Sequence, residues 1–303
     1  MMPRADVWAA GALPALILLG GCAAAPAAAP ARVHSLPPPP VRATRPPMRA
    51  GFAFDGAMIQ GGVVLGTAPS GTSLLTLDGA SVPVAPDGRF LIAFDRDAAA
   101  TAVLVATRDD GGVVRETLAI APRAWRIERL DSLARTSQPD AEFARLRAPE
   151  LAQIAAARRV ASDAGGWRQR FLWPATGRIS GLFGAQRVYK GEPGAYHSGV
   201  DVAKPTGATI IAPADGTVIL AADHPFTLEG NLLMIDHGQG LNSAFLHLSR
   251  IDVRVGERVR QGQVIGAVGA TGRATGPHLH WGMKWRDARI DPLLLAGPMP
   301  VAD

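Results

Sequence analysis

Short apolar runs separated by turn residues dominate this chain, and the pattern predicts a mainly β protein. In residues 52–127 the runs recur about every 8–12 residues, a spacing typical of a small β-sandwich that could be immunoglobulin-like. The strands expected from these runs lie at residues 63–65, 73–77, 90–94 and 102–106. No residue of this part forms a convincing catalytic group, and residues 95–97 (Asp-Arg-Asp) are expected to be an exposed turn.

A helical pattern follows the predicted sandwich. Pro149 suits a first helical turn, and apolar residues then recur at helical spacing from Leu151. The pair Gly165-Gly166 is a stop signal for such a helix. We therefore predict a sandwich domain over residues 51–130 and a helical connector over residues 131–166.

Strand and turn signals resume at Trp167, and they predict a C-terminal domain of antiparallel β structure over residues 167–303. Residues 208–220 and 255–266 resemble each other, since both place Gly at turns between short Val/Ile-rich strands. Lipoyl and biotinyl carrier domains share this texture. A carrier presents a lysine on a hairpin tip, however, and neither Lys204 nor Lys284 lies in such a motif.

The N-terminal segment is similar to a bacterial secretion signal. Arg4 precedes the apolar run Val7–Leu19, which is short for a membrane span and leads to Gly-Gly-Cys22. The end of the run resembles a lipobox, in which the cysteine is acylated and becomes the mature N-terminus. Cleavage of a plain signal peptide after a following alanine is the alternative. We predict a signal peptide over residues 1–21, and a periplasmic protein anchored to the outer membrane by a lipid on Cys22.

Composition adds two constraints to this picture. Residues 22–50 are rich in Ala and Pro and have little apolar surface to bury, so they predict an extended, semi-rigid tether. The net charge is +5, from 31 Lys and Arg against 26 Asp and Glu, and these charges form no dense basic block. Nucleic-acid binding is therefore not expected, whereas a weak attraction to an anionic polymer such as a cell wall is compatible with the charge.

Candidate metal ligands gather near the C-terminus. His197 and Asp201 are four residues apart with a glycine between them, and His278 and His280 lie two apart in a strand-like stretch that directs both to one face. With His247 in an apolar strand between the two pairs, the set predicts a zinc site of the His/His/carboxylate kind. His237 is expected to be structural, whereas His224 lies on a predicted loop.

Several motifs occur in a fixed order around these histidines. They are His197-Ser-Gly-Val-Asp201, Ala212-Pro-Ala-Asp-Gly216, Asp236-His-Gly238, Phe245-Leu-His247-Leu-Ser249, Gly262-Gln-Val-Ile-Gly266 and Thr275-Gly-Pro-His-Leu-His280. Together they resemble the lysostaphin/LytM-type zinc endopeptidases, which cut peptidoglycan cross-bridges. The resemblance covers about 130 residues, from Trp173 to the chain end.

The resemblance implies one Zn²⁺ per chain, bound by His197, Asp201 and His280. It also implies that His247 and His278 are the catalytic proton-transfer groups, without saying which of them is the base. The implied function is hydrolysis of peptidoglycan stem peptides or cross-links. The alternative is a non-hydrolytic scaffold that binds the wall or activates another wall hydrolase, although all five positions are filled. Phe245 stands where the family often has Tyr, and Trp281-Gly282 stands where Phe-Glu is frequent.

Overall fold

The computed structural model describes residues 49–130 and 141–300, which belong to one compact unit. The predicted signal peptide, Cys22 and almost all of the predicted tether lie outside the described residues, as do the first ten residues of the predicted connector. Among the described helices, none combines the length and the apolar character that a membrane crossing requires.

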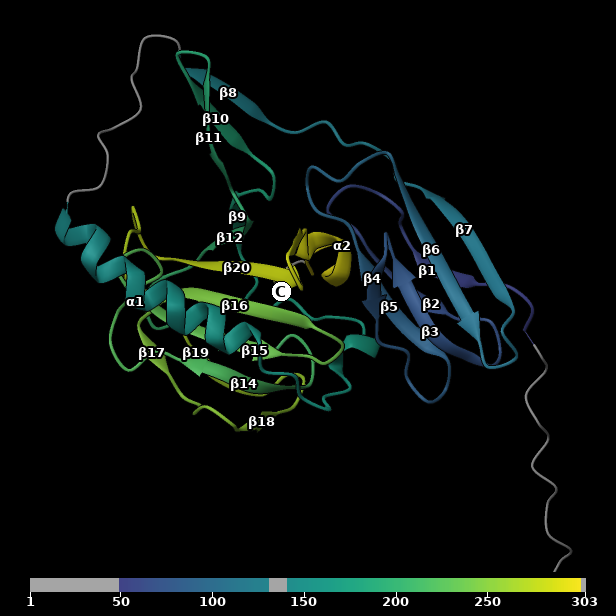
Figure 1. The fold of residues 1–303 in the computed structure, drawn as a ribbon. Coiled ribbons are helices and arrows are strands. Elements are labelled where there is room, and N and C mark those ends of the chain that lie inside the picture. Colours follow the sequence, from purple (N-terminus) through teal and green to yellow (C-terminus); the bar gives the residue numbers. More distant parts are fainter. Residues whose placement is uncertain (1–48, 131–140, 301–303) are drawn as a thin grey trace, which may run out of the picture. The chain divides into compact units, whose positions relative to one another are not determined.

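Strands over residues 53–119 form two antiparallel sheets, in the orders β1-β2-β5 and β4-β3-β6-β7 (Figure 1). Their bounds are β1 Ala53–Gly56, β2 Val63–Thr67, β3 Thr72–Leu77, β4 Ala80–Val82, β5 Arg89–Ala93, β6 Thr101–Arg108 and β7 Val113–Ala119. The four strands expected from the apolar runs are confirmed. Alternation explains their burial: in β6, Ala102, Leu104 and Ala106 are buried, and they share a core with Val64 and Ile92 of the other sheet.

The prediction that residues 95–97 form an exposed turn is wrong for Arg96, whose exposed fraction is only 6%. Its Nε donates to the carbonyl oxygen of Gly184 at 3.1 Å, and its Nη2 donates to Oε1 of Gln186 at 3.1 Å. The guanidinium lies 4.7 Å from the ring centroid of Tyr196. These partners are about ninety residues away in the sequence, so local polarity could not reveal them.

The connector also differs from the prediction. Its helix, α1, extends over Ala141–Arg158 and contains Pro149 in its interior, so the proline does not begin the helix and the helix ends before Gly165. An interior proline costs about 3 kcal/mol because it removes a backbone hydrogen bond. Residues 141–148 are mostly strong helix formers, and side chains on either side of the proline are anchored to the rest of the protein, which offsets that cost.

The C-terminal part is built around an eight-stranded antiparallel sheet, in the order β18-β14-β15-β16-β20-β12-β9 with β21 beside β20. Its strands are β9 Arg178–Gly181, β12 Gly199–Ala203, β14 Gly216–Ala221, β15 Asn231–Asp236, β16 Leu241–Leu248, β18 Arg258–Val259, β20 His278–Trp285 and β21 Ala288–Ile290. A second sheet contains β13 Thr209–Ile211, β19 Val264–Ala267 and β17 Arg250–Ile251. A third combines β8 Ile127–Leu130, β10 Gln186–Tyr189 and β11 Glu192–Tyr196. Two short helices, η1 Gly166–Arg168 and α2 Pro292–Ala296, complete the fold.

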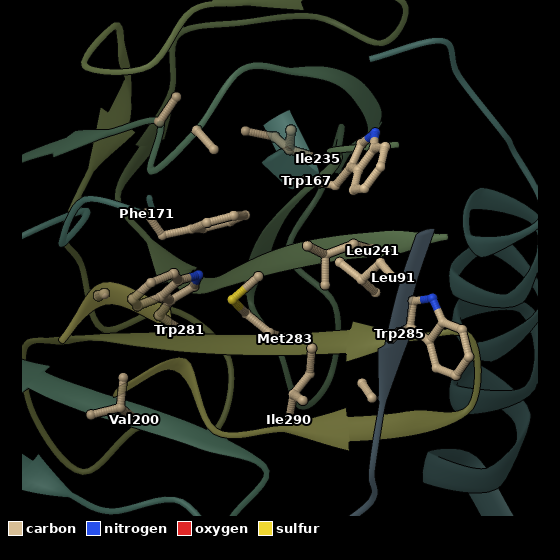
Figure 2. Close-up of a cluster of buried hydrophobic side chains, with 14 of the residues drawn as sticks. Leu91, Trp167, Phe171, Val200, Ile235, Leu241, Trp281, Met283, Trp285 and Ile290 are labelled. Carbon is tan, nitrogen blue, oxygen red and sulfur yellow. The ribbon is translucent and has the colours of Figure 1, made fainter. Parts of the chain in front are cut away.

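The two faces of the large sheet have different roles. One face packs the main core, in which Trp281 and Met283 of β20 lie beside Phe171 (Figure 2). On the other face, Leu232 and Met234 of β15 form a smaller cluster, which Ile154 and Ala157 of α1 cover. Figure 1 shows α1 crossing the large sheet at this place. Because side chains alternate along a strand, His280 and Lys284 project toward the face that α1 covers.

Candidate metal centre

His197, Asp201 and His280 meet at one point, and their potential ligand atoms all lie within 4.8 Å of one another. Nε2 of His197 is 3.0 Å from Oδ1 of Asp201, and Nδ1 of His280 is 2.8 Å from the same oxygen. The register between β12 and β20 pairs Asp201 directly with His280. Sheet pairing thus brings together residues that are 79 positions apart.

The charges of this group favour a cation. Nδ1 of His197 lies 3.0 Å from the carbonyl oxygen of Leu182; since a carbonyl can only accept, Nδ1 carries the hydrogen and Nε2 offers its electron pair to the site. Burial alone would raise the pKa of the Asp201 carboxyl, but the contacts with His197 and His280 outweigh it and hold that pKa far below its ordinary value. Burial lowers the pKa of His280, which favours its neutral, ligating form.

Two glycines leave space for this cluster. A Cβ at Gly181 would lie 2.3 Å from Oδ2 of Asp201 and 3.0 Å from Cε1 of His197. A Cβ at Gly199 would lie 2.7 Å from Nε2 of His280. The distances of 2.3 Å to Asp201 and 2.7 Å to His280 are shorter than a real Cβ tolerates, so a larger residue at either position would displace a ligand.

The donor set fits a metal ion. Nε2 of His197, Oδ1 of Asp201 and Nδ1 of His280 lie within 3.0 Å of one another, so a single cation could contact all three atoms at once. Two imidazoles and one carboxylate are a ligand set that leaves a coordination position for water or substrate. These described residues could therefore hold a catalytic metal.

His247 and His278 lie beside the three donors. Their ring centroids are 4.9 Å apart, and Nε2 of His278 is 3.9 Å from Oδ1 of Asp201. Each ring is oriented by its Nδ1–H, which donates at 2.8 Å to the carbonyl oxygen of Thr271 for His247 and of Gly276 for His278. In both, Nε2 is left as the basic nitrogen. Burial lowers the pKa of His247, which keeps this imidazole neutral.

His247 has an unusual backbone, with a φ of 65° in the left-handed region. Such a conformation costs a non-glycine residue about 1–3 kcal/mol and persists only where the surroundings enforce it. Here the N–H of His247 donates to the carbonyl oxygen of Glu229 at 2.8 Å. The positive φ ends the regular alternation of β16 next to Leu246, and the ring lies 4.9 Å from that of His278 and 6.4 Å from that of His280.

The remaining histidines near the site lie apart from the donors. His237 is fully buried and bonded at both ring nitrogens, to Asp215 and to Ser243, which confirms the expected structural role. His224 is exposed and pairs with Asp223 at 2.6 Å. Neither belongs to the group that could hold a metal.

A groove of about 770 Å³ runs from the site between α1 and the sheet. Ser198 and His280 line it at one end, and Arg158, Lys284 and Arg289 line it farther along. The sequence alone did not reveal this groove, because its walls come from α1 and from strands β15, β16 and β20, which begin more than seventy residues after α1 ends. The spacing of His280 and Lys284, four apart on one strand, was the one local signal.

Fold and site together define a mainly β protein with a His/Asp/His group that could hold a metal. Residues 195–292 match the model of Peptidase family M23. A solved Pseudomonas aeruginosa protein assigned to peptidase M23 is 31% identical, with a TM-score of 0.61, over 79% of this chain and 95% of that one. The chain belongs to Peptidase family M23.

The curated relatives match less than half of this chain. Peptidoglycan DD-endopeptidase ShyA of Vibrio cholerae is 37% identical over 132 residues, which are 43% of this chain and 30% of the relative. DD-carboxypeptidase/endopeptidase Mpg of Neisseria meningitidis is 36% identical over 129 residues, which are 41% of this chain and 28% of the relative. The matched region thus spans less than a third of the length of these two relatives.

Proposed function

We propose that this chain is a zinc-dependent endopeptidase that hydrolyses peptide cross-links or stem peptides of bacterial peptidoglycan. The observation that carries the proposal is the convergence of His197, Asp201 and His280 beside two further oriented histidines. The relatives named as peptidoglycan endopeptidases support the substrate class. Two nitrogens and one carboxylate oxygen suit zinc, and one ion per chain would be held by these three residues.

The chemistry divides between the metal and the protein. His197, Asp201 and His280 would hold the zinc ion, which would supply a Lewis acid for the scissile carbonyl and would acidify water near neutral pH. Nε2 of His247 or His278 accepts the proton released by the attacking water, because each ring is already held by its Nδ1–H. The other histidine, when protonated, donates to the carbonyl oxygen as negative charge develops there.

The domain layout supports a role at the cell wall. Lipid attachment at Cys22 would anchor the chain to the outer membrane from the periplasmic side, and the tether of residues 22–50 would span part of the distance to the wall. The β-sandwich of residues 51–130 would then position the peptidase domain of residues 167–303 against its substrate. Extraction of the protein into detergent, and its loss on Cys22→Ser, would test the anchor.

The function is tested with purified peptidoglycan and three proteins. Mass spectrometry of released muropeptides should show new peptide termini with the wild type, and a chelator should abolish them. His280→Ala should lose bound zinc together with cleavage. His247→Ala should keep zinc, measured by elemental analysis, and lose cleavage. A His247→Ala protein that still digests peptidoglycan would overturn the proposed roles.

The same experiment separates the enzyme from the non-hydrolytic alternative. A relative from Caulobacter vibrioides, 33% identical over 151 residues, is named cell division protein DipM, a name that states a cellular role and no reaction. If the zinc-loaded wild type binds peptidoglycan and releases no peptide, the scaffold function is correct and the endopeptidase is not.

A further inference from the structure

The groove between α1 and the large sheet has an uneven distribution of charge. Six of its lining residues are Arg or Lys, and only Glu229 and Asp287 are acidic. The lining of the groove includes His280, one of the three candidate ligands, so this end of the groove adjoins the metal centre. Charge of one sign along a cleft attracts ligands of the opposite sign.

The acidic residues near the groove offset only part of this charge. Glu229 and Asp287 raise the pKa of Arg158, and Asp287 and Asp95 raise the pKa of Lys284, but burial and the neighbouring cations outweigh them. Glu229 is occupied by Arg147, whose two terminal nitrogens donate to its two carboxylate oxygens at 2.6 and 2.7 Å. Asp287 is fully exposed, and its carboxylate lies 4.0 Å from Nζ of Lys284. Arg158 and Arg289 form no side-chain ion pair with any residue between positions 49–130 and 141–300.

Within the described part of the chain, Arg158 lacks a hydrogen-bond partner at one of its side-chain nitrogens. Its Nε is buried and has no hydrogen-bond partner among the described residues. Burial lowers the pKa of Arg158, and the charge of nearby Arg289 lowers it further. The pKa of Lys284 is likewise lowered by burial and then by Arg158. Repelling cations held in a half-buried groove destabilise the folded protein unless an anion offsets them.

We propose that Arg158, Lys284 and Arg289 form a subsite that binds a carboxylate of the peptide substrate, a few residues from the bond that is cut. This inference rests on the proposed function. Lys284 follows His280 by four residues on β20, a distance of about 13 Å along a strand. An extended peptide covers the same distance in about four residues. Guanidinium groups suit a carboxylate because they donate two parallel hydrogen bonds.

The ring of Tyr196 supports one side of this subsite. The Arg289 guanidinium lies 5.3 Å from its centroid, and Tyr196 directly precedes the metal ligand His197. This cation–π contact limits the orientations that the Arg289 guanidinium can take. Lys284, with 21% of its side chain exposed, lies deeper in the groove.

The test uses cross-linked muropeptide dimers whose carboxylates are free or converted to methylamides. With the zinc-loaded full chain, the double variant Lys284→Gln/Arg289→Gln should raise KM for the free-carboxylate dimer about tenfold or more, with little change in kcat. The amidated dimer should be cleaved equally by variant and wild type. Lys284→Arg should retain most of the affinity, and Arg254→Gln, an exposed position outside the groove, should behave as wild type.

A melting temperature equal to or above that of the wild type shows that the double variant folds, because removing repelling charges does not destabilise it. The proposal is wrong if this folded variant cleaves the free-carboxylate dimer with unchanged KM, or loses as much on the amidated dimer. If the wild type cleaves neither dimer, the proposed function fails. The subsite is then tested by calorimetry, which measures how both dimers bind to the metal-free wild type and to the metal-free double variant. The proposal is supported if the variant binds only the free-carboxylate dimer more weakly than the wild type does. It is wrong if the variant binds that dimer as tightly as the wild type does.

Discussion

The buried His237 lies in a chain of hydrogen bonds whose direction is fixed at one end. Its Nδ1 is 2.8 Å from the carbonyl oxygen of Asp215, which can only accept, so Nδ1 carries the hydrogen. Nε2 must then accept, and the hydroxyl of Ser243 donates to it at 2.8 Å. The hydroxyl oxygen of Ser243 accepts in turn from Nε1 of Trp281 at 3.2 Å. Every group is satisfied only while His237 is neutral.

Protonation of His237 would turn Nε2 into a donor facing a hydroxyl oxygen that already accepts from Trp281. Burial lowers the pKa of His237 from 6.5 to about 4, although the carbonyl of Asp215 acts in the opposite direction. Below pH 6.5 the unfolded chain therefore binds a proton that the folded protein refuses, so stability is full above that pH and falls as the pH decreases toward 4. At about 1.4 kcal/mol per pH unit, the loss amounts to about 3 kcal/mol.

The measurement compares wild type with His237→Gln, which has an amide donor and acceptor and does not titrate. Urea unfolding of chelator-treated protein should be followed between pH 7.5 and pH 4.5, so that metal release does not contribute. Over this range the wild type should lose about 2–3 kcal/mol more unfolding free energy than the variant. Parallel pH profiles for the two proteins would refute the argument, because they would mean that His237 takes up its proton equally well in the folded state.

Two further substitutions test the site and its support. Gly181→Ala should weaken zinc binding at least about tenfold in a competition titration, because the new Cβ would lie 2.3 Å from Oδ2 of Asp201. The control is Gly165→Ala, where the new Cβ would have no atom within 4 Å, and this variant should bind zinc as the wild type does. Arg147→Met should lower the unfolding free energy by about 3 kcal/mol, because it leaves the carboxylate of Glu229 half-buried and unpaired. The measurement is urea unfolding, and an unchanged unfolding free energy would contradict this account of how α1 is held.

Much of the fold followed from local pattern. The strands of the N-terminal sheets were predictable because apolar and polar positions alternate and glycine turns separate them, as β6 shows. The start of α1 was not predictable from Pro149, because what sustains the helix around the proline is distant in sequence. Arg147 is paired with Glu229, 82 residues away, and Glu150 accepts hydrogen bonds from Thr227, 77 residues away.

The candidate metal ligands were predictable for a related reason. The spacing of His278 and His280 places both on one face of a strand, and their motifs resemble a known family. Spacing could not show that Asp201 pairs with His280 across two strands, because register is set by the packing of both faces. It also could not show the burial of Arg96, which depends on a carbonyl 88 residues away.

His247 marks the limit of argument from alternation most clearly. In a regular strand His247 and Leu246 would face opposite sides, and the register pairs Leu246 with His280, so alternation predicts that His247 points away from the metal centre. The left-handed φ at His247 cancels this prediction and brings its ring beside His278. The carbonyl of Glu229 holds the backbone N–H in that conformation, and Arg147 of α1 holds the Glu229 side chain. The docking of α1 is therefore connected, through two side chains and one backbone bond, to the orientation of a proposed proton-transfer group.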